Sequence, residues 1–267
     1  MTATVFVGAD ELARLIADHP TKLRVIEVRR DSGDDPVTHL DGAVVAYLTT
    51  DLSREGTAPT EGKRPLPEVP TLQATLRRWG VDDDSTVVVY DVDGSFVAAR
   101  AWWVLRWAGL RDVRILDGGL PAWVASGHPG GETAADVSPG RVTVTGGHLE
   151  QLDAEGAATL AAEGRLIDAR SADAYAAGHI PGARNVGSGE TVSADGSLRD
   201  TAALRRLYQF DGDPPGLYCG GGVAAAHGVA VLTHLGVQAP LFVGSFSAWS
   251  ADPNRPVATA TPAGGTS

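Results

Sequence analysis

One sequence pattern occurs twice along the chain, and this repeat constrains the fold more than any other feature. Each copy opens with an apolar run that ends in an acid and an arginine, at residues 25–29 and 166–170. A turn containing His and Gly follows each run, at residues 39–43 and 179–183. Such internal similarity indicates a duplicated structural unit.

The later part of each copy aligns a carboxylate with a thiol. Two further apolar runs end in Asp91 and Cys219, and each is followed by a glycine-containing loop and an apolar helical run. The copies close at Trp123 and Trp249, which lie 32 positions after Asp91 and 30 positions after Cys219. The loop after Asp91 is therefore about two residues longer than the loop after Cys219.

Short apolar runs alternate with helical stretches, which include residues 71–79, 98–107 and 223–235. This alternation predicts an α/β fold in which each half is a small domain with a mainly parallel sheet flanked by helices. A chain of 267 residues has the length for two such domains. The predicted division is an N-terminal domain at residues 1–126, a Gly/Pro-rich linker at 127–147, a C-terminal domain at 148–258 and a disordered tail at 259–267.

A long segment of the first half, from Thr49 to Pro70, is rich in Pro, Gly, Thr and charged residues. Loops of this length in compact domains are uncommon and are often functional or mobile. Two of its basic residues, Lys63 and Arg64, are candidates to face a cleft. The sequence leaves open whether this segment takes part in chemistry or is a covering strap.

Charge and cysteine content exclude several classes of protein. A net charge of −11 without a Lys/Arg-rich run argues against binding to nucleic acid or to an anionic membrane surface. No run approaches the roughly 20 apolar residues that span a bilayer, and the N-terminus lacks a signal-peptide pattern, so we expect a cytoplasmic protein. A single cysteine forms no intramolecular disulfide and no cysteine zinc site, so any role of Cys219 is that of a thiol.

Cys219 lies after a predicted strand, on a loop with Gly220, Gly221 and Gly222 that leads into a predicted helix. Glycine permits backbone dihedrals that turn several N–H groups toward one point, and such a ring of donors binds an anion. The helix N-terminus adds partial positive charge, which favours the nucleophilic thiolate. Attack of this thiolate on a sulfur–sulfur bond leaves a second sulfur on Cys219 as a persulfide, which is again an anion.

The strand, the cysteine, the six-residue loop and the helix resemble the tandem rhodanese family of thiosulfate and 3-mercaptopyruvate sulfurtransferases, as do the His-Ile-Pro-Gly-Ala turn at residues 179–183 and the terminal Trp249. The resemblance covers almost the whole chain. It implies two tandem rhodanese-like domains, of which the C-terminal one is catalytic through Cys219 and the N-terminal one has Asp91 in place of the cysteine. It further implies transfer of sulfane sulfur from a small anionic donor to a thiol, cyanide or thioredoxin-like acceptor. We expect no cofactor and no metal.

The loop sequence bears on the choice of donor. Family members that prefer thiosulfate tend to carry Cys-Arg-Lys-Gly-Val-Thr, and those that use mercaptopyruvate tend to carry Cys-Gly-Ser-Gly-Val-Thr. Gly220, Gly222 and Val223 fit the second pattern, whereas Gly221 and Ala224 lack the expected hydroxyls. The loop also contains no Arg or Lys that would hold a dianion. We therefore predict that these five residues bind substrate and that 3-mercaptopyruvate is the better donor.

The resemblance adds Arg170 as a substrate-binding candidate, because it matches a family arginine beside the substrate pocket. A guanidinium binds a carboxylate or sulfonate by two hydrogen bonds. A second family arginine is missing, since Ala174 stands at its position. The alternative for Arg170 is a purely structural pair with an acid. His227 and His39 are weaker candidates, because the first can instead pack beside its helix and the second can instead fix its turn.

Two other functions fit parts of the pattern. A cysteine phosphatase with this fold requires an arginine six positions after the cysteine to bind the phosphoryl transition state, and Ala225 stands there. A sulfur-relay or regulatory persulfide-binding module with little turnover stays an alternative, because Gly221 and Ala224 lack hydroxyls. We expect a monomer, since the duplication already supplies a pseudo-dimer.

Overall fold

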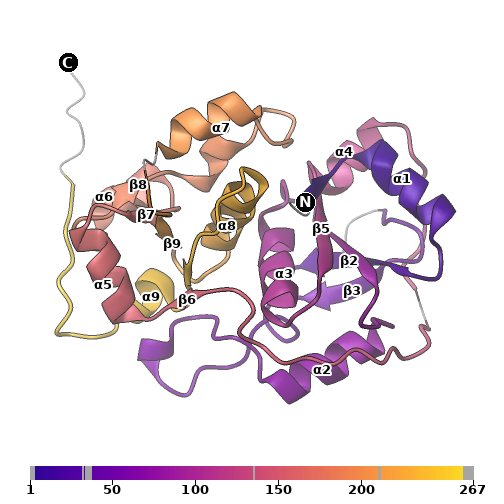
Figure 1. The fold of residues 1–267 in the computed structure, drawn as a ribbon, viewed down its shortest axis with the longest axis horizontal. Coiled ribbons are helices and arrows are strands. Elements are labelled where there is room, and N and C mark those ends of the chain that lie inside the picture. The colour runs from indigo at the N-terminus through magenta and orange to yellow at the C-terminus, as the bar shows by residue number, and fades with distance from the viewer. Residues whose placement is uncertain (1–3, 32, 34–37, 135, 210–211, 261–267) are drawn as a thin grey trace.

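The computed structural model describes residues 4–31, 33, 38–134, 136–209 and 212–260 and contains two α/β halves (Figure 1). The described part of the N-terminal half has five strands, four α-helices and one 3-10 helix, η1. In chain order these are β1 (Phe6–Val7), α1 (Ala9–Asp18), β2 (Leu23–Arg29), β3 (Val44–Tyr47), η1 (Pro59–Glu61), α2 (Val69–Arg78), β4 (Thr86–Tyr90), α3 (Phe96–Trp107), β5 (Asp112–Leu116) and α4 (Gly119–Ala125).

The C-terminal half repeats this order with one additional helix. In chain order its described elements are β6 (Gln151–Leu152), α5 (Ala154–Ala162), β7 (Leu166–Asp168), α6 (Ala172–Ala177), β8 (Arg184–Asn185), η2 (Ser188–Thr191), α7 (Thr201–Tyr208), β9 (Gly216–Tyr218), α8 (Ala224–His234), β10 (Leu241–Phe242) and α9 (Ser245–Trp249). The helices predicted at 71–79, 98–107 and 223–235 correspond to α2, α3 and α8 to within two residues.

The two sheets have equivalent strand orders, β1-β5-β4-β2-β3 and β6-β10-β9-β7-β8. Within each sheet all strand pairs are parallel. The predicted α/β fold, with two units that each have a parallel sheet flanked by helices, is therefore confirmed. Asp91 and Cys219 directly follow the central strands β4 and β9, so the two residues occupy equivalent places at the carboxyl ends of the sheets.

Helices α3 and α8 join the two halves. Both are apolar on nearly all sides, which is typical of helices that are buried all round. Each packs against its own sheet and against the other helix (Figure 1). One cluster of buried apolar side chains continues from Trp102 and Trp103 in α3 to Val229 and Leu232 in α8. Because close-packed interiors tolerate little displacement, this shared core fixes side chains of the first half relative to the Cys219 loop.

The predicted linker at residues 127–147 runs along the surface of the N-terminal half. Val142 is buried, and its N–H donates to the carbonyl of Val81 at 3.1 Å. Of the predicted tail, residues 261–267 lie outside the described residues, and the N–H of Ala260 donates to a carbonyl of α6 at 3.1 Å. The chain after α9 thus stays in contact with the C-terminal half up to Ala260, the last residue that the structure describes.

Each half extends one long connection onto the other half. The β3–α2 connection, residues 48–68, contains nearly all of the predicted Thr49–Pro70 excursion, since α2 begins at Val69. Its η1 segment packs beside α9 of the C-terminal half (Figure 1). The N–H of Lys63 donates to Oγ of Ser247 at 3.0 Å. This connection therefore lies over the C-terminal half, close to the loop that carries the cysteine.

The β8–α7 connection makes the reciprocal contact. The N–H of Leu198 donates to Oδ1 of Asp117 at 2.8 Å, between β5 and α4 of the N-terminal half. A methyl group built on Gly118 would lie 3.6 Å from the backbone nitrogen of Ser197. Each half therefore covers the loop region at the carboxyl end of the other half's sheet.

Candidate active site

Cys219 lies between the end of β9 and the start of α8, and only 3% of its surface is exposed. The N–H of Gly222 donates to its Sγ at 3.1 Å. Gly222 has a φ of +79°, a left-handed conformation that favours glycine. A side chain there would also lie 2.8 Å from the carbonyl oxygen of Val243. The backbone around the sulfur therefore requires glycine at position 222, and of the several amide donors that the sequence predicts, the N–H of Gly222 points at Sγ.

Ser245 lies directly behind the cysteine and was not anticipated from the sequence. Its Oγ accepts a hydrogen bond from the Cys219 N–H at 3.2 Å, donates to the carbonyl of Phe242 at 2.9 Å and lies 3.9 Å from Sγ. Its φ is +54°, and the repeat-equivalent residue of the first half is Gly119 with a φ of +60°. A serine held in this glycine conformation costs about 1–2 kcal/mol. The signal in the sequence was a serine where the aligned repeat has a glycine.

The equivalent loop of the N-terminal half holds an anion. Oδ1 of Asp91 accepts the N–H groups of Asp93 and Ser95 at 2.9 and 2.8 Å, and Oδ2 accepts those of Val97 and Ala98 at 2.7 and 2.8 Å. Burial raises the pKa of Asp91, and the four amide donors oppose this shift. The duplicated loop therefore directs its backbone N–H groups at the group that follows the central strand.

The β3–α2 connection brings the predicted candidates Lys63 and Arg64 to the cysteine loop. A methyl group built on Gly221 would lie 3.2 Å from Nη1 of Arg64 and 3.5 Å from Cβ of Lys63. The side chain that the family pattern places at position 221 would thus meet Arg64. The cations that the loop itself lacks come close to it from the other half of the chain.

Arg100 in α3 is a third cation beside the loop, and sequence reasoning missed its role. It is 0% exposed, and its Nη2 donates to the carbonyls of Arg64 at 3.0 Å and Leu52 at 3.4 Å. A methyl group built on Gly222 would lie 3.0 Å from its Nη1. Burial lowers the pKa of Arg100 to about 10, and the charge of Cys219 opposes this shift. The signal in the sequence was an arginine in the middle of a mostly apolar helical run. Arginine side chains are almost never fully buried unless they are paired.

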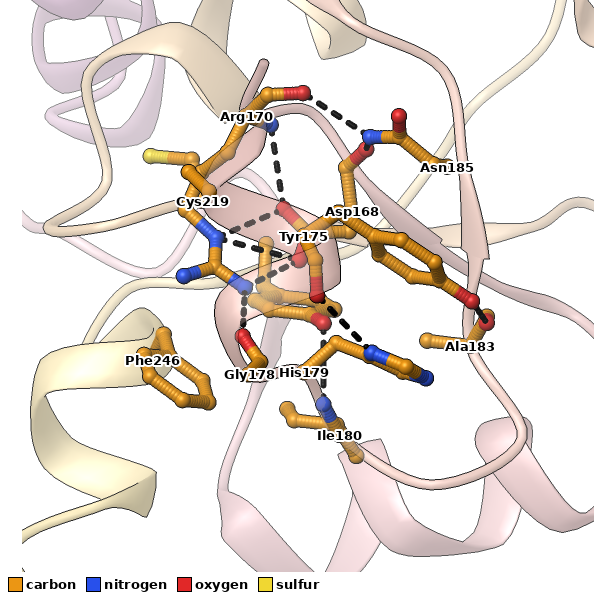
Figure 2. A network of polar contacts seen from close by, with 12 residues as sticks. Asp168, Arg170, Tyr175, Gly178, His179, Ile180, Ala183, Asn185, Cys219 and Phe246 are labelled. Atoms are coloured by element: carbon orange, nitrogen blue, oxygen red, sulfur yellow. Dashed lines mark hydrogen bonds and ion pairs between the residues drawn. The ribbon is translucent and has the colours of Figure 1, made fainter. Parts of the chain in front are cut away.

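Arg170 is held in a network with Asp168 (Figure 2). Its Nε lies 2.9 and 3.0 Å from the two Asp168 oxygens, and its Nη2 donates to the carbonyl of Gly178 at 2.6 Å. The guanidinium carbon lies 4.2 Å from the ring centre of Phe246, and the Phe246 N–H donates to the Cys219 carbonyl at 2.9 Å. These contacts are those of a structural ion pair, in a position next to the cysteine loop.

The two histidine candidates lie in different surroundings. Nδ1 of His39 lies 2.8 Å from Oε2 of Glu27, inside the N-terminal half, and thus belongs to the network that fixes its turn. His227 in α8 is fully buried, with Nε2 2.9 Å from Oγ1 of Thr191 and its ring 4.7 Å from that of Phe96. Burial lowers the pKa of His227 to about 4. The imidazole is therefore neutral at pH 7 and packs between the two halves.

Neither a metal site nor a membrane helix is found within the described ranges. No three His, Cys, Asp or Glu side chains are grouped there in a way that would hold a metal ion. No helix in that part of the chain has the length and apolar character needed to cross a membrane.

The buried His227 predicts a specific loss of stability in acid. Between about pH 6.5 and pH 4 the unfolded chain binds a proton at this residue and the folded chain does not, so the free energy of unfolding decreases as the pH falls. This contribution amounts to roughly 2–3 kcal/mol over that range. The variant His227→Gln keeps a polar group for Thr191. Its free energy of unfolding, measured by urea titration at about pH 6.5 and pH 4, should decrease less between the two pH values than that of the wild type. Equal losses in both proteins would contradict a neutral buried imidazole.

Comparison with known proteins identifies the family. The model of the rhodanese-like domain matches the chain twice, at residues 8–126 and 149–252. The chain is 42% identical to SseB of Mycobacterium tuberculosis, a proposed thiosulfate sulfurtransferase, over 96% of this chain and 98% of SseB. It is 33% identical to the 3-mercaptopyruvate sulfurtransferase of Escherichia coli K12, over 96% of this chain and 99% of that protein.

A solved structure agrees with this assignment. The crystal structure of SseA from Escherichia coli, described as a 3-mercaptopyruvate sulfotransferase, superposes with a TM-score of 0.77 at 29% identity and covers 91% of this chain and 99% of SseA. The resemblance seen in the sequence is confirmed by the double family match and by the shared fold. The chain belongs to the rhodanese-like family, as a member with two such domains in tandem.

Proposed function

We propose that Cys219 carries the transferred sulfur in this sulfurtransferase, as a persulfide. The observation that supports this most directly is the Gly222 N–H donated to Sγ, in a loop whose duplicate holds the Asp91 carboxylate with four amide donors. An environment built for an anion favours the thiolate, which is the nucleophilic form of cysteine. The start of α8 adds its partial positive charge to the same point.

The reaction has two displacement steps. The Cys219 thiolate attacks the transferable sulfur of the donor, and a sulfur–sulfur bond to Sγ forms while the bond between that sulfur and the rest of the donor breaks. The electron pair leaves with sulfite from thiosulfate, or with the enolate of pyruvate from 3-mercaptopyruvate. A thiolate or cyanide then attacks the outer sulfur, and Sγ leaves as a thiolate.

The substrate lies, in this proposal, against the loop from Gly220 to Ala224 and beneath the β3–α2 connection. The loop supplies backbone N–H groups, while Lys63 and Arg64 supply positive charge for a carboxylate or sulfonate. The ion pair between Arg170 and Asp168 fixes one wall of the site, so we assign Arg170 to support of the pocket with one face near Phe246. His39 and His227 have no step in this reaction.

We propose 3-mercaptopyruvate as the preferred donor, because Gly220, Gly222 and Val223 match the loop pattern of enzymes that use it. A thiol, cyanide or a thioredoxin-like protein fits the acceptor step, since each offers a nucleophile for the outer sulfur.

We place the reaction in the cytoplasm, where a reactive thiol stays reduced. We assign it to a monomer whose two halves cover each other. The sulfur-relay alternative is not favoured, because relatives that are 42% and 33% identical over 96% of this chain are named as sulfurtransferases.

The variant Cys219→Ser tests the assignment of the sulfur carrier. Oxygen replaces sulfur with little change of shape, so the variant should fold as the wild type and show no transfer of sulfur from donor to cyanide. Wild type incubated with donor should gain the mass of one sulfur atom in an intact-mass spectrum, and the variant should gain none. Transfer by the variant at the wild-type rate would exclude Cys219 as the carrier.

The donor is tested by comparing kcat/KM for 3-mercaptopyruvate and thiosulfate with cyanide as the acceptor. We expect a value at least tenfold higher for 3-mercaptopyruvate, because no loop cation holds the thiosulfate dianion. A higher value for thiosulfate would show that the neighbouring cations of the first half replace the missing loop cation and would reverse the donor assignment.

A further inference from the structure

Arg100 has an uncommon environment for a buried arginine. Its guanidinium is fully buried, and its Nε and Nη1 have no hydrogen-bond partner. Its Nη2 is donated to two backbone carbonyls of the β3–α2 connection, and no carboxylate is paired with it among the residues that the structure describes. A buried charge that lacks an opposite charge is strongly destabilising, so the fold must offer a counter-charge nearby.

The groups around Arg100 leave Cys219 as that counter-charge. Arg64, from the β3–α2 connection, is a cation and adds repulsion. On α8, His227 is neutral because burial lowers its pKa to about 4. Asp168 at the end of β7 is already bound by Arg170, and Asp91 is satisfied by four amide donors. Among the described residues, Cys219 is therefore the acid whose charge acts on the Arg100 guanidinium.

The backbone geometry of the loop places Arg100 and the sulfur next to the same residue, Gly222. Gly222 donates its N–H to Sγ at 3.1 Å, and the Cα substituent that Gly222 lacks would lie 3.0 Å from Nη1 of Arg100. A single glycine thus separates the unpartnered guanidinium nitrogen from the sulfur. Both positions are fixed, because α3 and α8 share one buried core.

We propose that Arg100, contributed by the half without the cysteine, is the counter-ion of Cys219 and keeps the free thiol as thiolate and the loaded residue as an anionic persulfide. Arg100 is a positioning residue, which acts through the sulfur and does not contact the donor. The inference rests on the proposed role of Cys219 as the sulfur carrier. Arg100 thereby supplies the positive charge that the loop after Cys219 does not contain.

The same guanidinium links the charge of the sulfur to the β3–α2 connection. Nη2 holds the carbonyls of Leu52 and Arg64, which lie near the two ends of the segment that covers the loop. When the sulfur is anionic, the guanidinium that holds this segment gains an opposite charge across Gly222. The anionic state of Cys219 and the seating of Arg64 over Gly221 therefore stabilise each other.

The test measures the ionisation of Cys219 directly, without donor or turnover. The chain has one cysteine, so the ultraviolet absorbance of the thiolate, taken as the difference from Cys219→Ser across a pH titration, reports this thiol alone. In Arg100→Gln and Arg100→Met the midpoint of ionisation should rise by at least about one pH unit, which is a tenfold loss of thiolate at pH values below the midpoint. Arg100→Lys, which keeps the charge, should shift it by less than half as much.

Arg106 provides the matched control on the same helix. Its guanidinium is half-buried and donates to the carbonyl of Leu110 at 3.0 Å, at the end of α3 away from the loop, so Arg106→Gln should leave the midpoint unchanged. Two neutral variants are used so that the test stands if one of them does not fold. Glutamine retains a hydrogen-bond donor for the carbonyls of Leu52 and Arg64, and methionine retains most of the side-chain volume. An unchanged midpoint in a folded neutral variant, or an equal shift in Arg100→Lys, would overturn the role of Arg100. The role of Cys219 as carrier is judged separately, by the mass gain of wild type.

Discussion

The proposed sulfur transfer requires that an anionic sulfur is held at a site with almost no exposure to solvent. Burying an unpaired anion is costly, and proteins offset this cost with hydrogen-bond donors and opposite charges. Here the observed backbone donor is the N–H of Gly222 in the loop after β9, in a conformation that glycine allows. The opposite charges lie on α3 and on the β3–α2 connection, both in the other half of the chain. The site is therefore complete only when the two halves are packed together.

The duplication explains why one half carries no cysteine and is still required. Both halves place an acidic group after the central strand, the carboxyl group of Asp91 and the thiol of Cys219. In the proposed reaction only the thiol gains and loses sulfur, so the chemistry is confined to the half that contains Cys219. The first half supplies the buried face of α3 and the segment that covers the cysteine loop. The reciprocal contact of Leu198 with Asp117 shows the same arrangement on the opposite side, over the N-terminal half.

The sequence was sufficient for features that depend on local pattern and not for those that depend on how the halves meet. Alternating strands and helices, and the alignment of Asp91 with Cys219, follow from periodicity and repeats, and the structure agrees with them. Arg100 was missed because its closeness to Cys219 arises from packing between α3 and α8, which no single repeat encodes. Ser245 was missed because the sequence alone does not show that the backbone φ of this residue is +54°. Arg170 matches a family pattern that the sequence shows, whereas its ion pair with Asp168 is seen in the structure.

The central claim is that the loop and the cations of the other half together hold an anionic persulfide on Cys219. The most direct measurement is a crystal structure of the donor-treated protein at neutral pH. We predict that the outer sulfur lies inside the loop, within hydrogen-bond distance of at least two backbone N–H groups of residues 220–224, with the Arg100 guanidinium beside the sulfur pair. An outer sulfur that points away from the loop amides and from Arg100, or a cysteine without added sulfur, would contradict the account.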